Sequence, residues 1–221
     1  MRRLLTTLLA VLLAVLLAGA PALAAAEGLW GQLFGQPQEP ETILVEIDVA
    51  GYGVITAELY PEYAPITVEN FVRLVNEGFY DGLTFHRIIE GFMIQGGDPL
   101  GNGTGGSSER IKGEFSANGW DNPLRHERGV LSMARAYMPD SASSQFFIMH
   151  EDAPWLDGQY AAFGRVLTGM EVVDAICANT PVTDGNGSVA KVNQPVITAI
   201  RVIEKPVEEP VEEPVEEPAA E

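Results

Sequence analysis

The chain has 221 residues, 46% of them hydrophobic and 20% charged, which suffices for one ordinary domain with a buried core and is too short for two comfortable domains. Its 31 acidic residues against 13 Lys and Arg give a net charge of −18, which leaves no basic patch for phosphate backbones, so we expect no nucleic-acid partner. The single cysteine, Cys177, excludes an internal disulfide, and the separated His86, His126 and His150 offer no zinc-ligand spacing, so we expect no metal.

Residues 1–24 have the layout of a secretory signal peptide. Met1-Arg2-Arg3 precedes an apolar run, and the small-residue sequence Ala22-Leu23-Ala24 follows it, after which we expect cleavage. The apolar segment is long enough to stay uncleaved as a membrane anchor, which remains the alternative. We therefore expect an exported protein, extracellular, periplasmic or associated with the cell envelope, that touches a membrane only if the signal is retained.

Two segments of low complexity flank the central part of the chain. Residues 25–41 mix Gly, Gln and Pro without a sustained period, which predicts a linker. Residues 205–221 contain the sequence Pro-Val-Glu-Glu three times, where proline blocks regular hydrogen bonding and paired glutamates repel each other. We expect a disordered acidic tail that keeps the protein soluble, and a role in binding cations or a wall polymer stays open.

Between these segments, residues 42–204 predict one domain made mainly of short β-strands. Strands at 43–49 and 54–59 are joined by Ala50-Gly51-Tyr52-Gly53, which suggests an antiparallel hairpin. A helix is expected from Thr67, as its N-cap, to Gly78. Further strands are expected at 84–89, 92–95, 129–134, 145–149, 161–166 and 195–203, with a second helix near 169–178. Many short strands and two helices predict a closed β-barrel with capped ends.

Several chemical motifs are absent or lack their structural context. Gly101 to Gly106 satisfies Gly-x-Gly-x-x-Gly, but it follows Asp98-Pro99 instead of a strand and precedes no apolar helix, so we do not expect dinucleotide binding. No nucleophile elbow, zinc-protease motif or phosphate-loop lysine occurs, and Cys177 lies on an apolar helix face, where a buried inert thiol is expected. Hydrolase chemistry therefore lacks its nucleophile.

Four motifs in order carry the functional signal: FHRIIEGFMIQGGDP at 85–99, RGVLSMARA at 128–136, SASSQFFIMH at 141–150 and WLDGQYAAFGRV at 155–166. Together they resemble the cyclophilin family of peptidyl-prolyl isomerases over residues 42–204, and GEFSANGWDNPLRHERGVLSMARA is similar to its bacterial branch. The resemblance implies a mainly β fold, a closed eight-stranded antiparallel β-barrel capped by two α-helices, with the site on the outer face because side chains fill the interior. It implies rotation about the bond before proline, a reaction that needs no nucleophile, metal or cofactor.

The resemblance also assigns roles to residues of this sequence. Arg87 matches the arginine that hydrogen-bonds to the proline nitrogen as the amide twists, and Gln95 matches the amide that holds the substrate carbonyl and helps to position the arginine. The proline pocket is implied at Phe92, Met93, Phe147 and Leu156. The groove for residues preceding proline is implied at Ala134, Gln145 and the backbone of Gly103. Without the resemblance, a structural salt bridge is the favoured interpretation of Arg87, and a place in the core is the favoured interpretation of the apolar positions.

Two positions depart from the best-known family pattern. Arg135 stands where many members have Asn, and we expect it to alter substrate affinity beside the peptide groove. Tyr160 stands where many members have His, and it can still pack on proline and offer a hydroxyl. The departures put substrate preference in doubt, not the reaction. Trp155 matches the position associated with binding cyclosporin, so inhibition by that peptide is expected.

Three functional hypotheses follow. The first is an exported, monomeric isomerase that assists protein folding by acting on proline-containing unfolded or nascent polypeptides. The second is a non-catalytic proline-peptide-binding or holdase module, in which replacing Arg87 leaves the biological effect intact. The third is a surface adhesion or scaffold protein in which the barrel only supports the acidic tail. The acidic surface suggests basic or unfolded clients, although net charge bears first on solubility.

Overall fold

The computed structural model describes residues 41–204. The predicted signal segment, the linker up to residue 40 and the acidic tail lie outside the described residues, so they stay predictions. Within 41–204, no helix combines the length and the apolar character that a membrane span requires.

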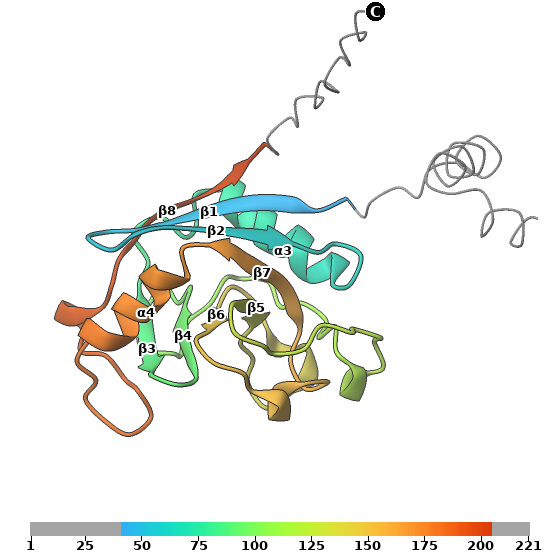
Figure 1. Cartoon of the computed structure of the whole chain (residues 1–221). Coiled ribbons are helices and arrows are strands. Elements are labelled where there is room, and N and C mark those ends of the chain that lie inside the picture. Colours follow the sequence, from blue (N-terminus) through green and yellow to red (C-terminus); the bar gives the residue numbers. More distant parts are fainter. Residues whose placement is uncertain (1–40, 205–221) are drawn as a thin grey trace, which may run out of the picture. The chain divides into compact units, whose positions relative to one another are not determined.

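Eight antiparallel strands form one sheet in the described part of the chain, in the spatial order β3-β4-β6-β5-β7-β2-β1-β8 (Figure 1). Their bounds are β1 Ile43–Val49, β2 Gly53–Leu59, β3 Phe85–Ile89, β4 Met93–Gly96, β5 Val130–Met133, β6 Phe146–Met149, β7 Ala162–Thr168 and β8 Ile197–Ile203. The sheet curls into a half-barrel, and its two outer strands meet where Thr84 bridges Val196. The expected eight-stranded antiparallel architecture is confirmed, with a closure between β3 and β8 that is a short contact instead of a full strand pairing.

The inner face of the curled sheet forms the main core. Val45, Ile47 and Val49 of β1 are buried, as their predicted alternation requires, because successive side chains of a strand point to opposite faces. Aromatic rings fill the centre: the ring centroid of Phe71 lies 5.1 Å from that of Tyr80, 5.4 Å from that of Phe146 and 5.2 Å from that of Phe163. The interior is thus packed with side chains, which leaves the outer face for a ligand site.

The first helix, α3 at Pro65–Asn76, corrects one prediction. Thr67 is not its N-cap, because the helix begins at Pro65, whose fixed φ suits the first turn, and Ala64 precedes it. The free N–H groups of Ile66 and Thr67 instead donate to the buried carboxylate of Glu114 at 2.9 Å and 2.8 Å. The helix also ends at Asn76, two residues before the predicted Gly78.

The second helix, α4 at Met170–Asn179, packs on β2 and β4. It buries Val172, Val173, Ile176 and Cys177. Burial raises the pKa of Cys177 to about 12, so the thiol stays protonated. The prediction that Cys177 is buried is confirmed.

Candidate active site

A row of side chains crosses four neighbouring strands on the outer face of the sheet. The register aligns Arg87 of β3 with Gln95 of β4, Gln95 with Phe147 of β6, and Phe147 with Ser132 of β5. Met93 shares the face of Gln95, because residues two apart in a strand point the same way. Strand pairing therefore brings together site residues that come from distant parts of the sequence.

Arg87 belongs to a continuous chain of hydrogen bonds. Its Nε donates to the carbonyl of Asn186 at 2.8 Å, and its Nη1 donates to Oε1 of Gln95 at 3.1 Å. The chain continues from Nε2 of Gln95 to Oε1 of Gln145 at 2.9 Å, and from Nε2 of Gln145 to the carbonyl of Gly105 at 2.7 Å. Burial lowers the pKa of the half-buried Arg87 guanidinium, which nevertheless stays charged. Its Nη2 has no hydrogen-bond partner among residues 41–204, so it is free for a ligand.

The segment 184–189 positions Arg87, and sequence reasoning missed it. Ser188 bridges Arg87, and the carbonyl of Gly187 accepts from the N–H of Ile88 at 2.8 Å, so the segment runs beside β3. Gly187 has φ of +79°, and a Cβ there would collide with the Ile88 carbonyl oxygen, so glycine permits this approach. The available signal was the turn-forming composition of residues 184–187, which does not reveal where the turn packs.

A cavity of about 200 Å³ with one apolar wall opens beside Arg87. Its lining residues are Arg87, Phe92, Met93, Gln95, Ala134, Arg135, Phe147, Leu156 and Tyr160. Met93, Phe147 and Leu156 are buried in a small apolar cluster that is separate from the main core. These residues therefore fit both interpretations of the sequence, since they are core-like and still line a cavity. The apolar wall excludes water from one side of the guanidinium, which strengthens its electrostatic interactions.

A second cavity of about 380 Å³ continues the first. The two share Gln95, Ala134 and Arg135, and the second adds Gly103 and Gln145. The residues expected to bind the part of a peptide before proline are thus side by side. Trp155 lines neither of these two cavities: its side chain is 65% exposed and its ring centroid lies 5.9 Å from that of Phe92, at the rim.

The glycine-rich loop at 101–106 encloses a carboxylate of the protein itself. The backbone amides of Leu100, Asn102 and Gly103 donate to the carboxylate of Asp98 at 2.8, 3.0 and 2.6 Å. Burial by itself would raise the pKa of Asp98, but these amides outweigh burial and hold the pKa below its usual value. Because the loop uses its amides on Asp98, it is not arranged to hold a phosphate.

A Ser-His-Asp hydrogen-bond chain lies beneath the site, and sequence analysis missed it. His126 Nδ1 lies 3.0 Å from Oδ1 of Asp157, and His126 Nε2 lies 3.0 Å from Oγ of Ser132. Ser132 is fully buried and lines none of the cavities described, so a substrate carbonyl cannot reach its hydroxyl. The His126 ring stacks on Phe147 with a centroid distance of 6.1 Å and an interplanar angle of 21°. The chain therefore supports the cavity floor instead of providing a nucleophile.

Comparisons with known proteins show the family to which the chain belongs. The sequence profile of the family "Cyclophilin type peptidyl-prolyl cis-trans isomerase/CLD" matches residues 44–202. Peptidyl-prolyl cis-trans isomerase B of Bacillus subtilis is 56% identical over 117 residues, which cover 53% of this chain and 78% of the relative. A peptidyl-prolyl cis-trans isomerase of Helicobacter pylori is 48% identical over 126 residues, which cover 56% of this chain and 75% of the relative.

A solved structure shows the same similarity in three dimensions. The crystal structure of a Cryptosporidium parvum cyclophilin-type peptidyl-prolyl cis-trans isomerase, in the presence of the dipeptide Ala-Pro, superimposes with a TM-score of 0.65 at 34% identity. The superposition covers 73% of this chain and 99% of that chain. The chain belongs to the cyclophilin-type peptidyl-prolyl cis-trans isomerase family. It is an enzyme of the peptidyl-prolyl cis-trans isomerase class.

Proposed function

We propose that Arg87 catalyses rotation about X-Pro bonds of exported proteins and that the enzyme thereby assists their folding. The observation that carries the proposal is the charged guanidinium of Arg87. Asn186 and Gln95 hold it beside the apolar wall of the first cavity, and its Nη2 stays free within the described residues. A charged guanidinium in this position suits the reaction, because rotation about the amide before proline is favoured by a fixed hydrogen-bond donor beside an amide that is shielded from water.

The proposed mechanism stabilises the twisted amide. Planar X-Pro bonds are separated by a barrier of about 18–20 kcal/mol, because rotation destroys amide resonance. As conjugation is lost the proline nitrogen becomes basic, and a hydrogen bond from Arg87 then stabilises the twisted state more than either planar state. Phe92, Met93, Phe147 and Leu156 hold the proline ring and exclude water, which strengthens that hydrogen bond.

The remaining site residues hold the peptide. Gln95 donates one N–H to Gln145, and its second N–H is available for the substrate carbonyl. Gly103, Ala134 and Gln145 line the second cavity, where residues preceding proline extend. The exposed ring of Trp155 beside Phe92 offers an apolar rim for the bulky peptide cyclosporin, which we expect to inhibit the enzyme.

The proposal of export rests on residues 1–24 of the sequence. Their basic start, apolar run and small-residue end have the form of a secretory signal. The clients we propose are proline-containing unfolded or nascent exported chains in the periplasm, the extracellular space or the cell envelope, and the enzyme acts on them as a monomer. Cell fractionation with mass spectrometry of the N-terminus tests this, because cleavage after Ala24 supports export, whereas an intact N-terminus in the cytosol contradicts it.

Catalysis is tested by following cis-to-trans relaxation of a proline tetrapeptide with the full chain, its Arg87→Ala variant and added cyclosporin. The uncatalysed process takes roughly 10–100 s. We expect acceleration by the parent protein, loss of most of it in Arg87→Ala, and inhibition by cyclosporin. If the folded parent protein does not accelerate relaxation but still binds the peptide, the groove is a non-catalytic or holdase surface.

A further inference from the structure

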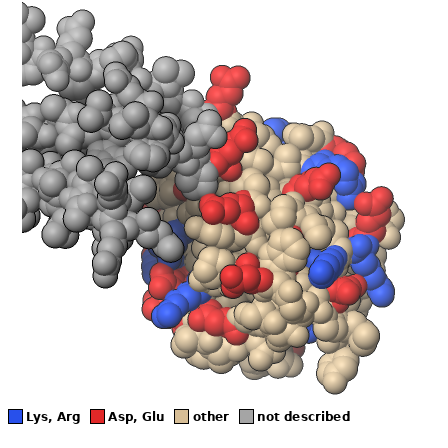
Figure 2. All heavy atoms as spheres, turned by 90° about the vertical axis from the view of Figure 1, so that its right-hand side faces the viewer, with Lys and Arg blue, Asp and Glu red and all other residues tan. Residues whose placement is uncertain are grey.

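The cavities of the site carry positive charge that no carboxylate of their lining compensates, although the whole chain has a net charge of −18. Arg110 and Arg135 line the second cavity, and Arg87, Arg135 and Lys191 line a third of about 750 Å³. No Asp or Glu is among the described lining residues of the three cavities. On the face shown in Figure 2, acidic and basic side chains are interspersed.

Arg135 is fixed by neutral groups. Its Nε donates to the carbonyl of Gln159 at 3.0 Å, and its Nη1 donates to the carbonyls of Ala136 and Tyr137 at 3.0 and 3.1 Å. Its guanidinium carbon lies 4.7 Å from the ring centroid of Tyr160. No ion pair to Arg135 occurs within residues 41–204, so its charge is held in place without being neutralised. The two departures from the family pattern, Arg135 and Tyr160, are therefore one stacked pair.

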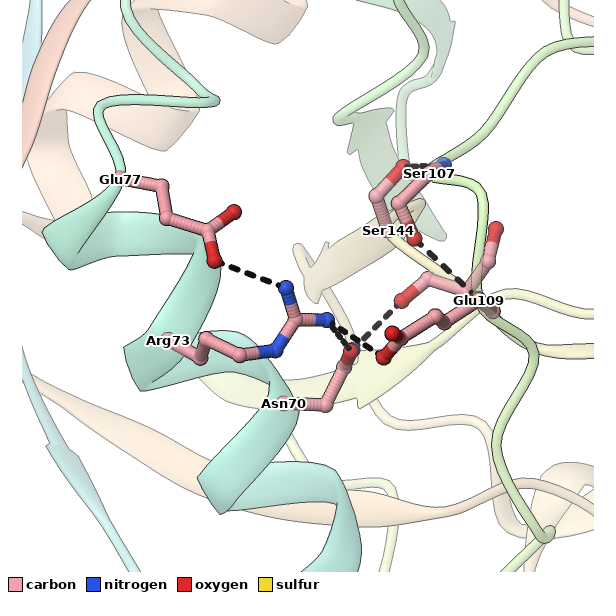
Figure 3. A network of polar contacts seen from close by, with 7 residues as sticks. Asn70, Arg73, Glu77, Ser107, Glu109 and Ser144 are labelled. Carbon is pink, nitrogen blue, oxygen red and sulfur yellow. Dashed lines mark hydrogen bonds and ion pairs between the residues drawn. The ribbon is translucent and has the colours of Figure 1, made fainter.

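Arg110 also lacks a carboxylate partner in the part of the chain that the structure describes. Its neighbour Glu109 is engaged by Arg73, whose Nη2 lies 3.2 Å from Oε2 of Glu109 and whose Nη1 lies 3.0 Å from Oε1 of Glu77 (Figure 3). The N–H of Ser107 donates to Oγ of Ser144 at 3.0 Å, which fixes the loop that carries Arg110 to the segment just before β6. The carboxylate nearest to Arg110 in sequence is thus bound by another arginine.

We propose that the groove formed by these three cavities selects polypeptide substrates with Asp or Glu just before the proline. Arg110 and Arg135 bind the carboxylates of these residues. The inference rests on the proposed function and names its substrate class. Guanidinium groups suit this role, because they bind carboxylates with two parallel hydrogen bonds. The charge of the groove thus favours acidic segments, whereas the net charge of the chain alone suggested basic clients.

The chain itself contains segments of this class. The sequence Glu-Glu-Pro occurs at 208–210, 212–214 and 216–218. A synthetic peptide with the sequence of residues 206–218 is therefore a suitable probe, and the same peptide with Gln in place of every Glu is its control. Competition by the first peptide and not by the second is expected in the assay below.

The experiment compares kcat/KM of the full-length enzyme for Ala-Glu-Glu-Pro-Ala, Ala-Gln-Gln-Pro-Ala and Ala-Lys-Lys-Pro-Ala, measured by NMR exchange. At low salt we expect the Glu peptide to exceed the Lys peptide by about tenfold, which two partly exposed ion pairs can supply. The preference should shrink as salt screens these charges. In the Arg110→Gln/Arg135→Gln variant, the Glu and Gln peptides should agree within about twofold.

The loss of Arg135 could disturb the fold, so the variant Arg110→Gln is measured as well. Arg110 makes no side-chain hydrogen bond within residues 41–204, so this substitution should leave the fold intact. We expect it to reduce the preference for the Glu peptide. Arg201→Gln is the matched control, since it removes the same charge from an ion pair with Asp81 outside the groove. Equal rates for the Glu and Gln peptides in the wild type, or an unchanged preference in the double variant, would overturn the inference.

Failure to accelerate the Gln peptide would instead contradict the proposed function. Any competition by the enzyme's own tail lowers all three rates equally, so the ratios still decide.

Discussion

The guanidinium of Arg87 has one partner that the sequence indicated and one that it did not. Gln95 was expected because the family resemblance implies that this amide helps to position the arginine. The carbonyl of Asn186 was not expected, because every residue has a backbone carbonyl and its use depends on where a distant turn packs. The same limit hid His126, whose contacts with Ser132 and Asp157 depend on the folded chain.

Gln95 positions Arg87 by accepting from its Nη1, in addition to offering an N–H to the substrate carbonyl. The substitution Gln95→Leu keeps the approximate size and removes this acceptor. We expect kcat to fall by about tenfold with a smaller change in KM, because the guanidinium loses its orientation while the apolar wall of the cavity remains. Steady-state kinetics on a proline peptide measures both constants. Gln159→Leu is the control, since that side chain is exposed, and equal effects of both substitutions would contradict the role of Gln95.

At the level of elements, strands were easier to predict than their connections. The strand positions follow from alternation and turn residues, so β1 to β8 lie within a few residues of the predicted ranges. The start of α3 was wrong because its N-terminal amides are capped by Glu114, which is far away in sequence. The placement of segment 184–189 beside β3 was missed for a similar reason, since long-range contacts have no local signature.

The contact between segment 184–189 and β3 can be tested with Gly187→Ala. The added Cβ would meet the Ile88 carbonyl oxygen and displace the segment that holds Arg87. Gly51→Ala is the matched control, because Gly51 has a similar φ of +77° and no atom within 4 Å of the added Cβ. We expect Gly51→Ala to cost about 1 kcal/mol in the free energy of unfolding and Gly187→Ala about 2 kcal/mol more. Of the two variants, only Gly187→Ala should also lower kcat/KM. Urea unfolding measures the stability of both variants, and the isomerase assay measures their kcat/KM. Equal effects of the two substitutions would contradict the role of segment 184–189.

For the whole molecule, buried histidines link stability to pH. Burial lowers the pKa of His86, whose two ring nitrogens have no hydrogen-bond partner within the described residues, and burial also lowers the pKa of His126. The unfolded chain therefore binds more protons than the folded chain just below the ordinary histidine pKa of about 6.5. The stability contributed by neutral, buried histidine is complete above that pH and is lost as the pH falls below it.

We therefore expect the free energy of unfolding to fall between pH 7 and pH 5, by at most about 1.4 kcal/mol per pH unit for each histidine. His86→Leu removes one of the two groups and leaves no unpaired ring nitrogen, so its slope should be smaller. Urea unfolding at several pH values measures both slopes. An identical slope in His86→Leu would show that His86 does not contribute.

The central claim is that the planar guanidinium of Arg87, with its N–H donors held in fixed positions, performs the catalysis. The substitution Arg87→Lys tests this most directly, because lysine keeps the positive charge but lacks the planar set of donors. The measurement is the exchange rate of a proline peptide bound to the folded variant, together with its affinity. We predict that kcat/KM falls by about a hundredfold, as for loss of one preorganised donor, while the peptide still binds. A variant that retains kcat/KM within about threefold of the wild type would contradict the account.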